Sequence, residues 1–306
     1  MSVKEVKQGN LTWIHISRID PEAIEYLKNN FKFHSLDIED IKTEHPTPKL
    51  DVYKNYLFLI AQVPHLKISN EKIISHEVGV FIGDGYVITI QESKNREIKN
   101  LFYRCANNRK IRNEWMEKGS GFLLYNILNE LFSEVGSSLR AIGKQLAVIE
   151  DEVYREEGQT VSEIKQLGQH RRNIHTVRRI IDPQRFIIST LSHTRRTFLD
   201  ESLSIYFDDV RDLLDRLWVV TESYSQTSDG LHWTIESIIN QRTTKVISAL
   251  TVISVAFMPL TLLSGIYGMN IDLPLAHNST VVFGIFGILL LGITFLIYQL
   301  RKKRWL

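Results

Sequence analysis

The sequence predicts an α+β membrane protein with an N-terminal α/β domain, a long helical stalk and two C-terminal transmembrane helices. Residues 1–100 mix strand and helix patterns, and residues 203–266 contain only one proline and two glycines. Two runs at the end of the chain, 246–271 and 273–300, lack Asp, Glu, Lys and Arg. Because a helix needs about 20 apolar residues to cross a bilayer, each run can span a membrane.

Strand signals are confined to the first hundred residues. Residues 11–16 alternate between apolar and polar side chains, and residues 56–63 form an apolar run typical of a buried strand. The runs 78–82 and 86–91 flank the sequence Gly-Asp-Gly at 83–85, which predicts a β-hairpin.

Two short helices are expected among these strands. Asp20 followed by Pro21 is typical of a helix start, and this helix should reach about residue 30. Residues 36–42 form a second helical candidate, which the sequence His-Pro-Thr-Pro at 45–48 closes.

From about residue 94 onward the chain shows only helix patterns. We expect one long helix at 121–157 and another at 161–197, where Pro183 should kink or break the second helix. Residues 203–266 predict a single helix of about 90 Å, at 1.5 Å per residue. This helix would continue without interruption into the first apolar run.

The charge of the chain excludes one broad class of function. The 37 Lys and Arg face 35 Asp and Glu, and four of the basic residues lie in the tail 301–304. One acidic residue, Asp272, also lies beyond position 245, so residues 1–245 carry 33 basic and 34 acidic residues and a net charge of −1, which argues against a nucleic-acid binder. The lone Cys105 cannot form an internal disulfide, which favours a reducing cytosol for the soluble part. The N-terminus shows no signal-peptide pattern.

No catalytic constellation is visible, so we expect no enzyme activity and no organic cofactor. The sequence has no Walker-type phosphate loop and no His-Glu-x-x-His motif. Arginine pairs recur on the helix at 161–197, at 171–172, 178–179 and 195–196. We expect these arginines to pair with acidic side chains of neighbouring helices.

Positive charge predicts the orientation in the membrane. Arg242 and Lys245 precede the first apolar run, the basic tail follows the second, and the loop between the runs has no Lys or Arg. The positive-inside rule then places both termini in the cytoplasm of a multi-pass protein in the plasma (inner) membrane.

One face of the first apolar run is polar or small for most of its length. Steps of four and three residues pass through Asn240, Thr244, Ile247, Thr251, Ser254, Met258, Thr261 and Gly265. Such a stripe allows close packing of transmembrane helices, and it equally suits a helix that faces water. A pore would require a ring of subunits, because one such helix cannot enclose a channel.

The end of the chain resembles a known family. The sequence Tyr-Gly-Met-Asn at 267–270 follows Met-Pro-Leu-Thr at 258–261 and precedes a second apolar run and a Lys-Lys-Arg-Trp-Leu end. This arrangement is similar to the CorA-type magnesium and divalent-cation channels, which carry a Gly-Met-Asn motif between two spans. Segments 36–41, 45–50 and 206–210 also look like parts of that family.

The resemblance implies a fold and an activity. It implies a funnel-shaped homopentamer that takes up Mg²⁺ passively across the membrane, often with Co²⁺ and Ni²⁺. The expected parts are an α/β cytoplasmic domain at 1–115, a cytoplasmic helical hairpin at 116–200, the cytoplasmic part of the stalk helix at 201–245, a pore-lining first span at 246–267, an extracytoplasmic Gly-Met-Asn loop at 268–279, a second span at 280–300 and a basic cytoplasmic tail at 301–306.

The resemblance also assigns roles to single residues. Gly268, Met269 and Asn270 match the selectivity filter, and Asp272 is the one acidic residue at the outer mouth. Apolar pore constrictions match Ile247, Leu250 and Met258, while wider pore-lining positions would be Asn240, Thr244, Thr251, Ser254, Thr261 and Gly265. A regulatory, inter-subunit Mg²⁺ site would be formed by Asp209, Glu39 and Asp40.

Plainer interpretations stay open for each of these assignments. Asn270 would also suit the cap of an ordinary membrane turn, and Asp209 would also suit a solvated helix face. The whole chain would also fit a zinc or other transition-metal transporter of the same fold. A more distant alternative is a membrane-anchored sensor or scaffold that transports nothing.

Overall fold

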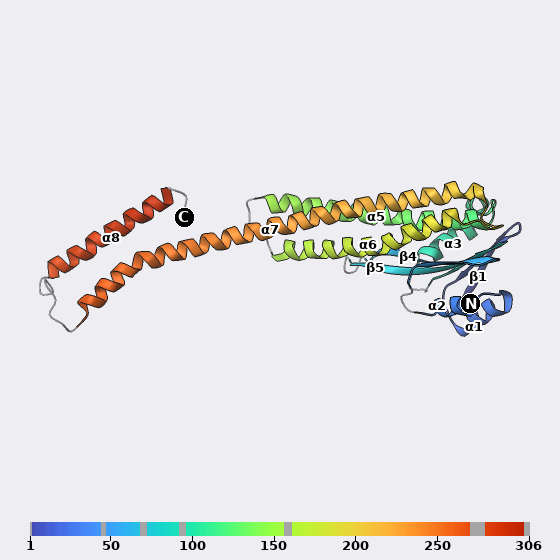
Figure 1. The fold of residues 1–306 in the computed structure, drawn as a ribbon, viewed down its shortest axis with the longest axis horizontal. Coiled ribbons are helices and arrows are strands. Elements are labelled where there is room, and N and C mark those ends of the chain that lie inside the picture. Colours follow the sequence, from blue (N-terminus) through green and yellow to red (C-terminus); the bar gives the residue numbers. More distant parts are fainter. Residues whose placement is uncertain are drawn as a thin grey trace. The chain divides into compact units, whose positions relative to one another are not determined.

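The computed structural model describes residues 2–43, 47–67, 72–91, 96–155, 161–269 and 279–302 (Figure 1). The chain divides into two compact units, Met1–His232 and Trp233–Leu306. The strands are β1 Val3–Gln8, β2 Leu11–Ile16, β3 Lys49–Val52, β4 Tyr56–Lys67, β5 Lys72–Gly83 and β6 Tyr86–Ile90. The helices are α1 Pro21–Asn30, α2 Ser35–Asp40, α3 Glu97–Asn107, α4 Arg109–Met116, α5 Ser120–Tyr154, α6 Val161–His193, α7 Ser204–Tyr267 and α8 Ser279–Lys302.

The six described strands form one sheet in the order β1-β2-β6-β5-β4-β3. All neighbours are antiparallel except β2 and β6, which run parallel. The predicted hairpin is confirmed, because β5 and β6 pair across a turn in which Gly85 has a φ of 74°. A positive φ at such a turn is accessible to glycine at little cost.

Each face of this sheet is covered by helices. On one face, Phe58, Phe81 and Ile88 pack with Leu27 of α1 and Ile38 of α2 in a single buried cluster. The opposite face lies against helices α3 to α6: Trp13 of β2 meets Phe102 of α3 edge-on, with ring centroids 5.3 Å apart. Helices α5 and α6 contact β4 and β5.

Local sequence signals explain where the short helices begin. The Asp20 side chain accepts a hydrogen bond of 2.8 Å from the backbone N–H of Ala23, and Pro21 occupies the first turn, as the sequence predicted. This cap lowers the pKa of Asp20, because the Ala23 N–H favours the charged carboxylate. His34 caps α2 in the same manner, through the N–H of Leu36.

His15 is a buried, pH-sensitive group on the face of the sheet that α3 covers. It is 2% exposed, its ring lies 5.5 Å from that of Phe102, and its Nδ1 lies 3.3 Å from Thr89 Oγ1. Burial lowers the pKa of His15 from 6.5 to about 4, and the positive charges of Lys4 and Lys99 act in the same direction. The folded protein therefore holds this imidazole neutral at pH values where the unfolded chain protonates it.

We expect the stability of the protein to fall between pH 6.5 and pH 4 because of His15. The unfolded state binds more protons in this window, so the stabilisation is complete above pH 6.5 and roughly 3 kcal/mol is lost by pH 4. Thermal unfolding of the full chain in detergent, followed by tryptophan fluorescence, measures this loss. The His15→Asn variant should show a flatter pH profile, and parallel profiles of wild type and variant would contradict the assignment.

The long helices α5, α6 and α7 pack through apolar faces and charged pairs. Arg171 and Arg178 of α6 form ion pairs with Asp229 and Glu222 of α7, at 2.9 and 2.8 Å, which confirms the prediction for these two arginines. Arg196 instead donates to the backbone carbonyl of Tyr53 at 2.9 Å. Helix α6 continues through Pro183 without a break.

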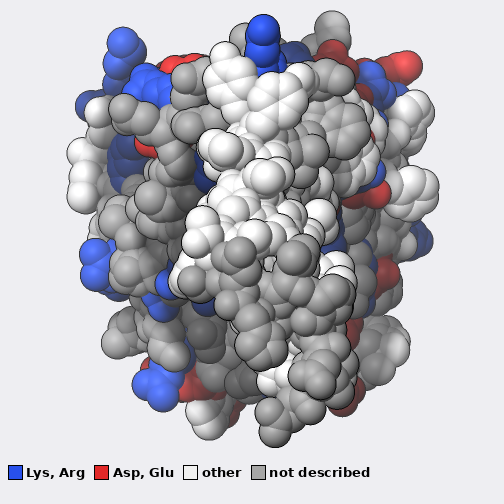
Figure 2. All heavy atoms as spheres, turned by 90° about the vertical axis from the view of Figure 1, so that its left-hand side faces the viewer, with Lys and Arg blue, Asp and Glu red and all other residues white. Residues whose placement is uncertain are grey.

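Helix α7 extends from Ser204 to Tyr267, which confirms the predicted single helix at 203–266 to within one residue at each end. Among the described residues, the segment Glu201–Tyr267 is the one helix long and apolar enough to cross a membrane, and Thr280–Phe295 is a shorter apolar stretch of α8. Figure 2 shows uncharged described residues in the middle of the view, with Lys, Arg, Asp and Glu visible toward its rim. The described segment 246–269 contains no Asp, Glu, Lys or Arg.

Candidate functional site

The polar stripe of α7 lies on one side of the helix. A groove of about 620 Å³ runs along this side, and its lining includes Ser254, Met258, Thr261 and Gly265 together with Met269. These five positions are four, three, four and four residues apart, which is the spacing that places residues on one helix face. The part of the predicted stripe from Ser254 onward therefore lies along this groove, which the apolar side chains of Phe257, Leu262 and Ile266 also line.

The threonine hydroxyls of the stripe donate to their own helix. Thr244, Thr251 and Thr261 each donate a hydrogen bond to the carbonyl four residues earlier, with distances of 2.9, 2.8 and 3.0 Å. A hydroxyl has one hydrogen and two lone pairs, so a donated hydrogen leaves the oxygen able to accept. The outward side of the stripe thus offers hydrogen-bond acceptors.

The predicted apolar constrictions are exposed on the single chain. Ile247, Leu250 and Met258 are 58%, 63% and 67% exposed. Contiguous exposed apolar surface of this kind is not stable in water. It requires lipid, another helix or further copies of the chain.

The predicted filter follows directly on the end of α7. Gly268 N–H donates to the carbonyl of Ser264 at 3.0 Å, and Met269 N–H donates to that of Ile266 at 3.1 Å. These bonds close the last turn of the helix, so the chain leaves the helix at the predicted motif. Asn270 and Asp272 lie outside the described residues.

The residues predicted for the regulatory site fall in two places. Asp40 and Glu39 lie at the end of α2, whereas Asp209 lies in the first turns of α7, where it is exposed and accepts a 3.3 Å hydrogen bond from Tyr125. Among the described residues, the carboxylates that approach Asp40 are Asp37 and Asp51, within 4.8 Å of one another. The predicted cation site joins Asp209 of one subunit to Asp40 of another, so it has to be tested on the assembled protein.

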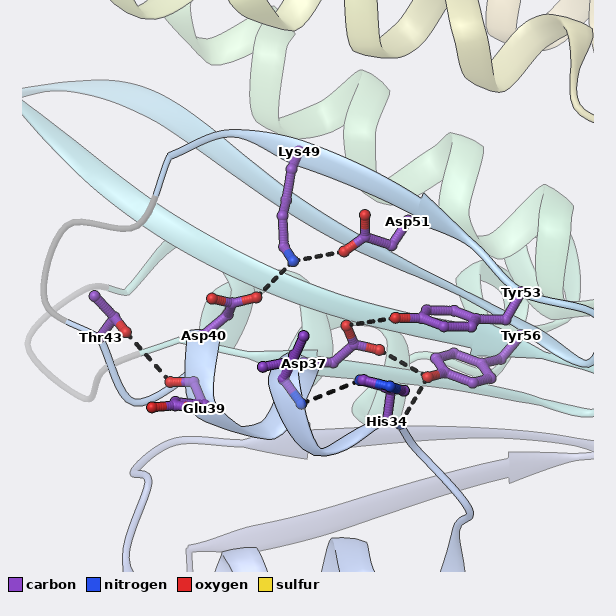
Figure 3. A network of polar contacts seen from close by, with 10 residues as sticks. His34, Asp37, Glu39, Asp40, Thr43, Lys49, Asp51, Tyr53 and Tyr56 are labelled. Carbon is purple, nitrogen blue, oxygen red and sulfur yellow. Dashed lines mark hydrogen bonds and ion pairs between the residues drawn. The ribbon is translucent and has the colours of Figure 1, made fainter.

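Figure 3 shows that a lysine already neutralises Asp40. The ammonium group of Lys49 lies 2.5 Å from carboxylate oxygens of both Asp40 and Asp51. Burial works against the charge of Lys49, but the bonds to Asp40 and Asp51 raise its pKa. A divalent cation at Asp40 therefore has to compete with a cation supplied by the chain itself.

The neighbouring Asp37 belongs to a tyrosine network. Tyr53 and Tyr56 donate to its two oxygens at 3.0 and 2.7 Å, and the Tyr56 hydroxyl also accepts from the backbone N–H of His34 (Figure 3). Burial, followed by the bond to Asp37, raises the pKa of Tyr56. With its oxygens occupied, the fully buried Asp37 holds α2 against β4.

Sequence reasoning missed one cluster in the first unit. His65, His76 and Glu97 bring possible ligand atoms within 4.8 Å of one another. Their spacings along the chain, 11 and 21 residues, match no metal-binding motif. Only the register of β4 against β5 would have revealed that the two histidines meet.

Comparison with known proteins decides the family. The family model described as CorA-like Mg2+ transporter protein matches residues 8–303. The chain belongs to the CorA family. It is accordingly a divalent metal ion transporter with at least one membrane-crossing helix, and not an enzyme, as the sequence predicted.

Relatives within the CorA family cover nearly the whole chain. The chain is 28% identical to the cobalt/magnesium transport protein CorA of Thermotoga maritima, over 96% of this chain and 83% of that one. It is 27% identical to the putative metal ion transporter YfjQ of Bacillus subtilis, over 99% and 93%. It is also 20% identical to the zinc transport protein ZntB of Yersinia pseudotuberculosis, over 96% and 88%.

A solved structure has the same fold. The CorA magnesium transporter from Methanocaldococcus jannaschii matches with a TM-score of 0.82 at 20% identity, over 98% of this chain and 93% of that one. The predicted fold class, with an N-terminal α/β domain, a long helical stalk and C-terminal helices, is therefore confirmed.

Proposed function

We propose that this CorA-family chain forms a passive channel for Mg²⁺ uptake across the plasma membrane, with Co²⁺ and Ni²⁺ as further permeant ions. The channel would be a ring of identical subunits, a pentamer as in the family pattern stated above. Residues 246–267 would line the pore, residues 280–300 would form an outer second span, and both termini would lie in the cytoplasm.

The observation that carries this proposal is the acceptor-lined face of α7. A hydrated Mg²⁺ ion presents water hydrogens, because it holds its inner waters tightly. Thr244, Thr251 and Thr261 have donated their own hydrogens to the helix and keep lone pairs for such water. The same bond forms at Thr243, off the stripe, and at Thr294 of α8, so the support comes from the gathering of such hydroxyls on one face rather than from the bond itself.

The filter would be a ring of Asn270 amide oxygens with backbone carbonyls at Gly268, and Met269 would pack the turn. Such a ring can hold the hydrated ion through its water shell. Asp272 would add a single acidic residue per subunit at the outer mouth. Below the filter, Met258, Leu250 and Ile247 would form apolar rings that close the pore by dewetting.

The regulation would be exerted by Mg²⁺ between subunits. Asp209 of one subunit would share the ion with Glu39 and Asp40 of a neighbour, so that bound Mg²⁺ screens mutual repulsion and holds a closed ring. Loss of internal Mg²⁺ would loosen the ring, as a ligand that biases a two-state element does.

Ion competition in proteoliposomes tests the proposed activity. A divalent ion gains about 4.6 kcal/mol per 100 mV, from about 2.3 per charge, so an inside-negative potential without ATP should drive Mg²⁺ entry. We expect Co²⁺ and Ni²⁺ to compete with this entry. Faster entry of Zn²⁺ than of Mg²⁺ would favour a zinc transporter, and the absence of any divalent flux would favour a membrane-anchored scaffold.

A further inference from the structure

The cluster of His65, His76 and Glu97 lies where two strands meet the start of a helix. In the register of β4 and β5, His76 pairs with Val63 and His65 pairs with Ile74. The two histidines are therefore diagonal neighbours on one face of the sheet. Their rings stack with centroids 4.5 Å apart, and Glu97 reaches them from the first residue of α3.

Both histidines point the same ring atom at the same carboxylate oxygen. The Nδ1 atoms of His65 and His76 each lie 2.8 Å from Glu97 Oε1. The contact of His76 is a hydrogen bond, with Nδ1–H as the donor in the tautomer that suits the carboxylate, and the contact of His65 has the distance of an ion pair. Two nitrogens and one carboxylate oxygen thus converge on one small volume.

We propose that His65, His76 and Glu97 form a binding site for a borderline divalent cation such as Zn²⁺ or Co²⁺. Two imidazoles and a carboxylate make up a known ligand set for zinc. Bonds of 2.0–2.1 Å in a tetrahedron place ligand atoms about 3.3 Å apart, so each nitrogen has to retreat by only about half an ångström. The hydrogens on Nδ1 move to Nε2 when the ion takes their place.

Neighbouring groups hold the Glu97 carboxylate in a fixed orientation. Gln91 Nε2 donates to Glu97 Oε2 at 3.0 Å, and Gln91 Oε1 accepts from the backbone N–H of Ile98 at 3.0 Å. Gln91 is 3% exposed, so this amide is fixed in the core. Such partners orient a ligating carboxylate, while the N-terminus of α3 favours its negative charge.

The exposure of the cluster leaves a position for a further ligand. The side chains of His76 and Glu97 are 10% and 7% exposed, whereas that of His65 is 40% exposed. An ion held here can complete its tetrahedron with water from the side of His65.

Burial works against the charge of Glu97, but the hydrogen bond from His76 prevails and lowers the pKa of Glu97.

The ligand chemistry separates this site from the proposed transport path. Mg²⁺ requires oxygen ligands in an octahedron, and imidazole nitrogens favour Zn²⁺, Co²⁺ and Ni²⁺. The site is therefore independent of the proposed Mg²⁺ transport. Bound metal would cross-link β4, β5 and α3.

Co²⁺ absorption on the purified full chain in detergent, with Mg²⁺ in large excess, tests the site. Excess Mg²⁺ occupies sites made of oxygens, and tetrahedral Co²⁺ absorbs visible light far more strongly than octahedral Co²⁺. We expect one tetrahedral Co²⁺ per chain, displaced by Zn²⁺, and a higher thermal midpoint with Zn²⁺. A wild type that gives only the weak octahedral spectrum would overturn the proposal.

Three variants and one control locate the ion. Removing a residue that only hydrogen-bonds to a metal ligand costs about 10–100-fold in metal affinity. Removing a ligand itself should cost more, so we expect His65→Asn, His76→Asn and Glu97→Gln each to weaken Co²⁺ binding by about 100-fold or more. His175→Asn, which changes an exposed histidine of α6, should bind like wild type. His65 is partly exposed and should tolerate its change, which a metal-free thermal midpoint checks. Unchanged affinity in folded His65→Asn would overturn the proposal.

Discussion

Replacing Asn270 by alanine should abolish Mg²⁺ flux while the protein still assembles in the membrane. The amide oxygen is the group that we propose to hold the water shell of the ion, and every subunit of the ring would lose it at once. A hydrogen bond to a charged partner contributes about 1.5–3 kcal/mol. The loss of several such bonds should reduce flux on the order of 100-fold or more. A Mg²⁺-sensitive dye inside proteoliposomes measures this rate.

The control for this variant lies in the same loop. Asn278→Ala removes the same amide eight residues further along, outside the Gly-Met-Asn sequence. We expect its flux to stay within about twofold of wild type, since Asn278 is not part of the proposed filter. Wild-type flux in Asn270→Ala would remove Asn270 from the filter, whereas loss of flux in both variants would point to a general effect on the loop.

Replacing Asp209 by alanine should make the channel resistant to inhibition by internal Mg²⁺. In the proposed mechanism, this carboxylate supplies part of the negative charge that bound Mg²⁺ screens. Asp209 is exposed and accepts a hydrogen bond from Tyr125 at the surface, so we expect its removal to leave the packing of α7 intact. We expect the concentration of internal Mg²⁺ that halves the flux to rise at least tenfold, which the same dye assay with preloaded Mg²⁺ measures.

Two further variants sharpen this experiment. Asp212 is an exposed residue one turn further along α7, and its carboxylate pairs with Arg211. The Asp212→Ala variant should leave the inhibition by internal Mg²⁺ unchanged. Lys49→Met removes the cation that neutralises Asp40 and should shift the inhibition to lower Mg²⁺. If Asp209→Ala and Asp212→Ala respond alike, the regulatory role belongs to the general charge of the helix rather than to Asp209.

Helices were the most predictable part of the fold, because their signals are local. The Asp20–Pro21 start requires only neighbouring residues, and the length of α7 follows from a run in which few residues interrupt a helix. The face of α7 with Thr251, Ser254 and Thr261 was equally predictable, since helix periodicity alone assigns residues to a side.

Two strands escaped sequence reasoning for a physical reason. Strands β1 and β3 occupy the two edges of the sheet. Edge strands are commonly short and charged, which protects them from pairing with other chains. The sequences Val-Lys-Glu-Val-Lys-Gln and Lys-Leu-Asp-Val accordingly lack the apolar signal that identified β4.

The sites that depend on long-range pairing were also beyond prediction. The neutralisation of Asp40 by Lys49 arises because β3 passes the end of α2, and the meeting of His65 with His76 depends on strand register. Neither follows from a local pattern. Conversely, the filter assignment came from a motif, and residues 270–278 lie outside the described part of the chain, so Asn270 is known by its sequence position alone.

The threonine hydroxyls of α7, which donate their hydrogens to backbone carbonyls, affect whether a cation or an anion can pass. If Thr244, Thr251 and Thr261 line the pathway, their free lone pairs face its axis and their hydrogens do not. Chloride, which needs hydrogen-bond donors around it, would find none on these side chains. At the depths of these three threonines, the wall would thus discriminate against anions without a single charged residue.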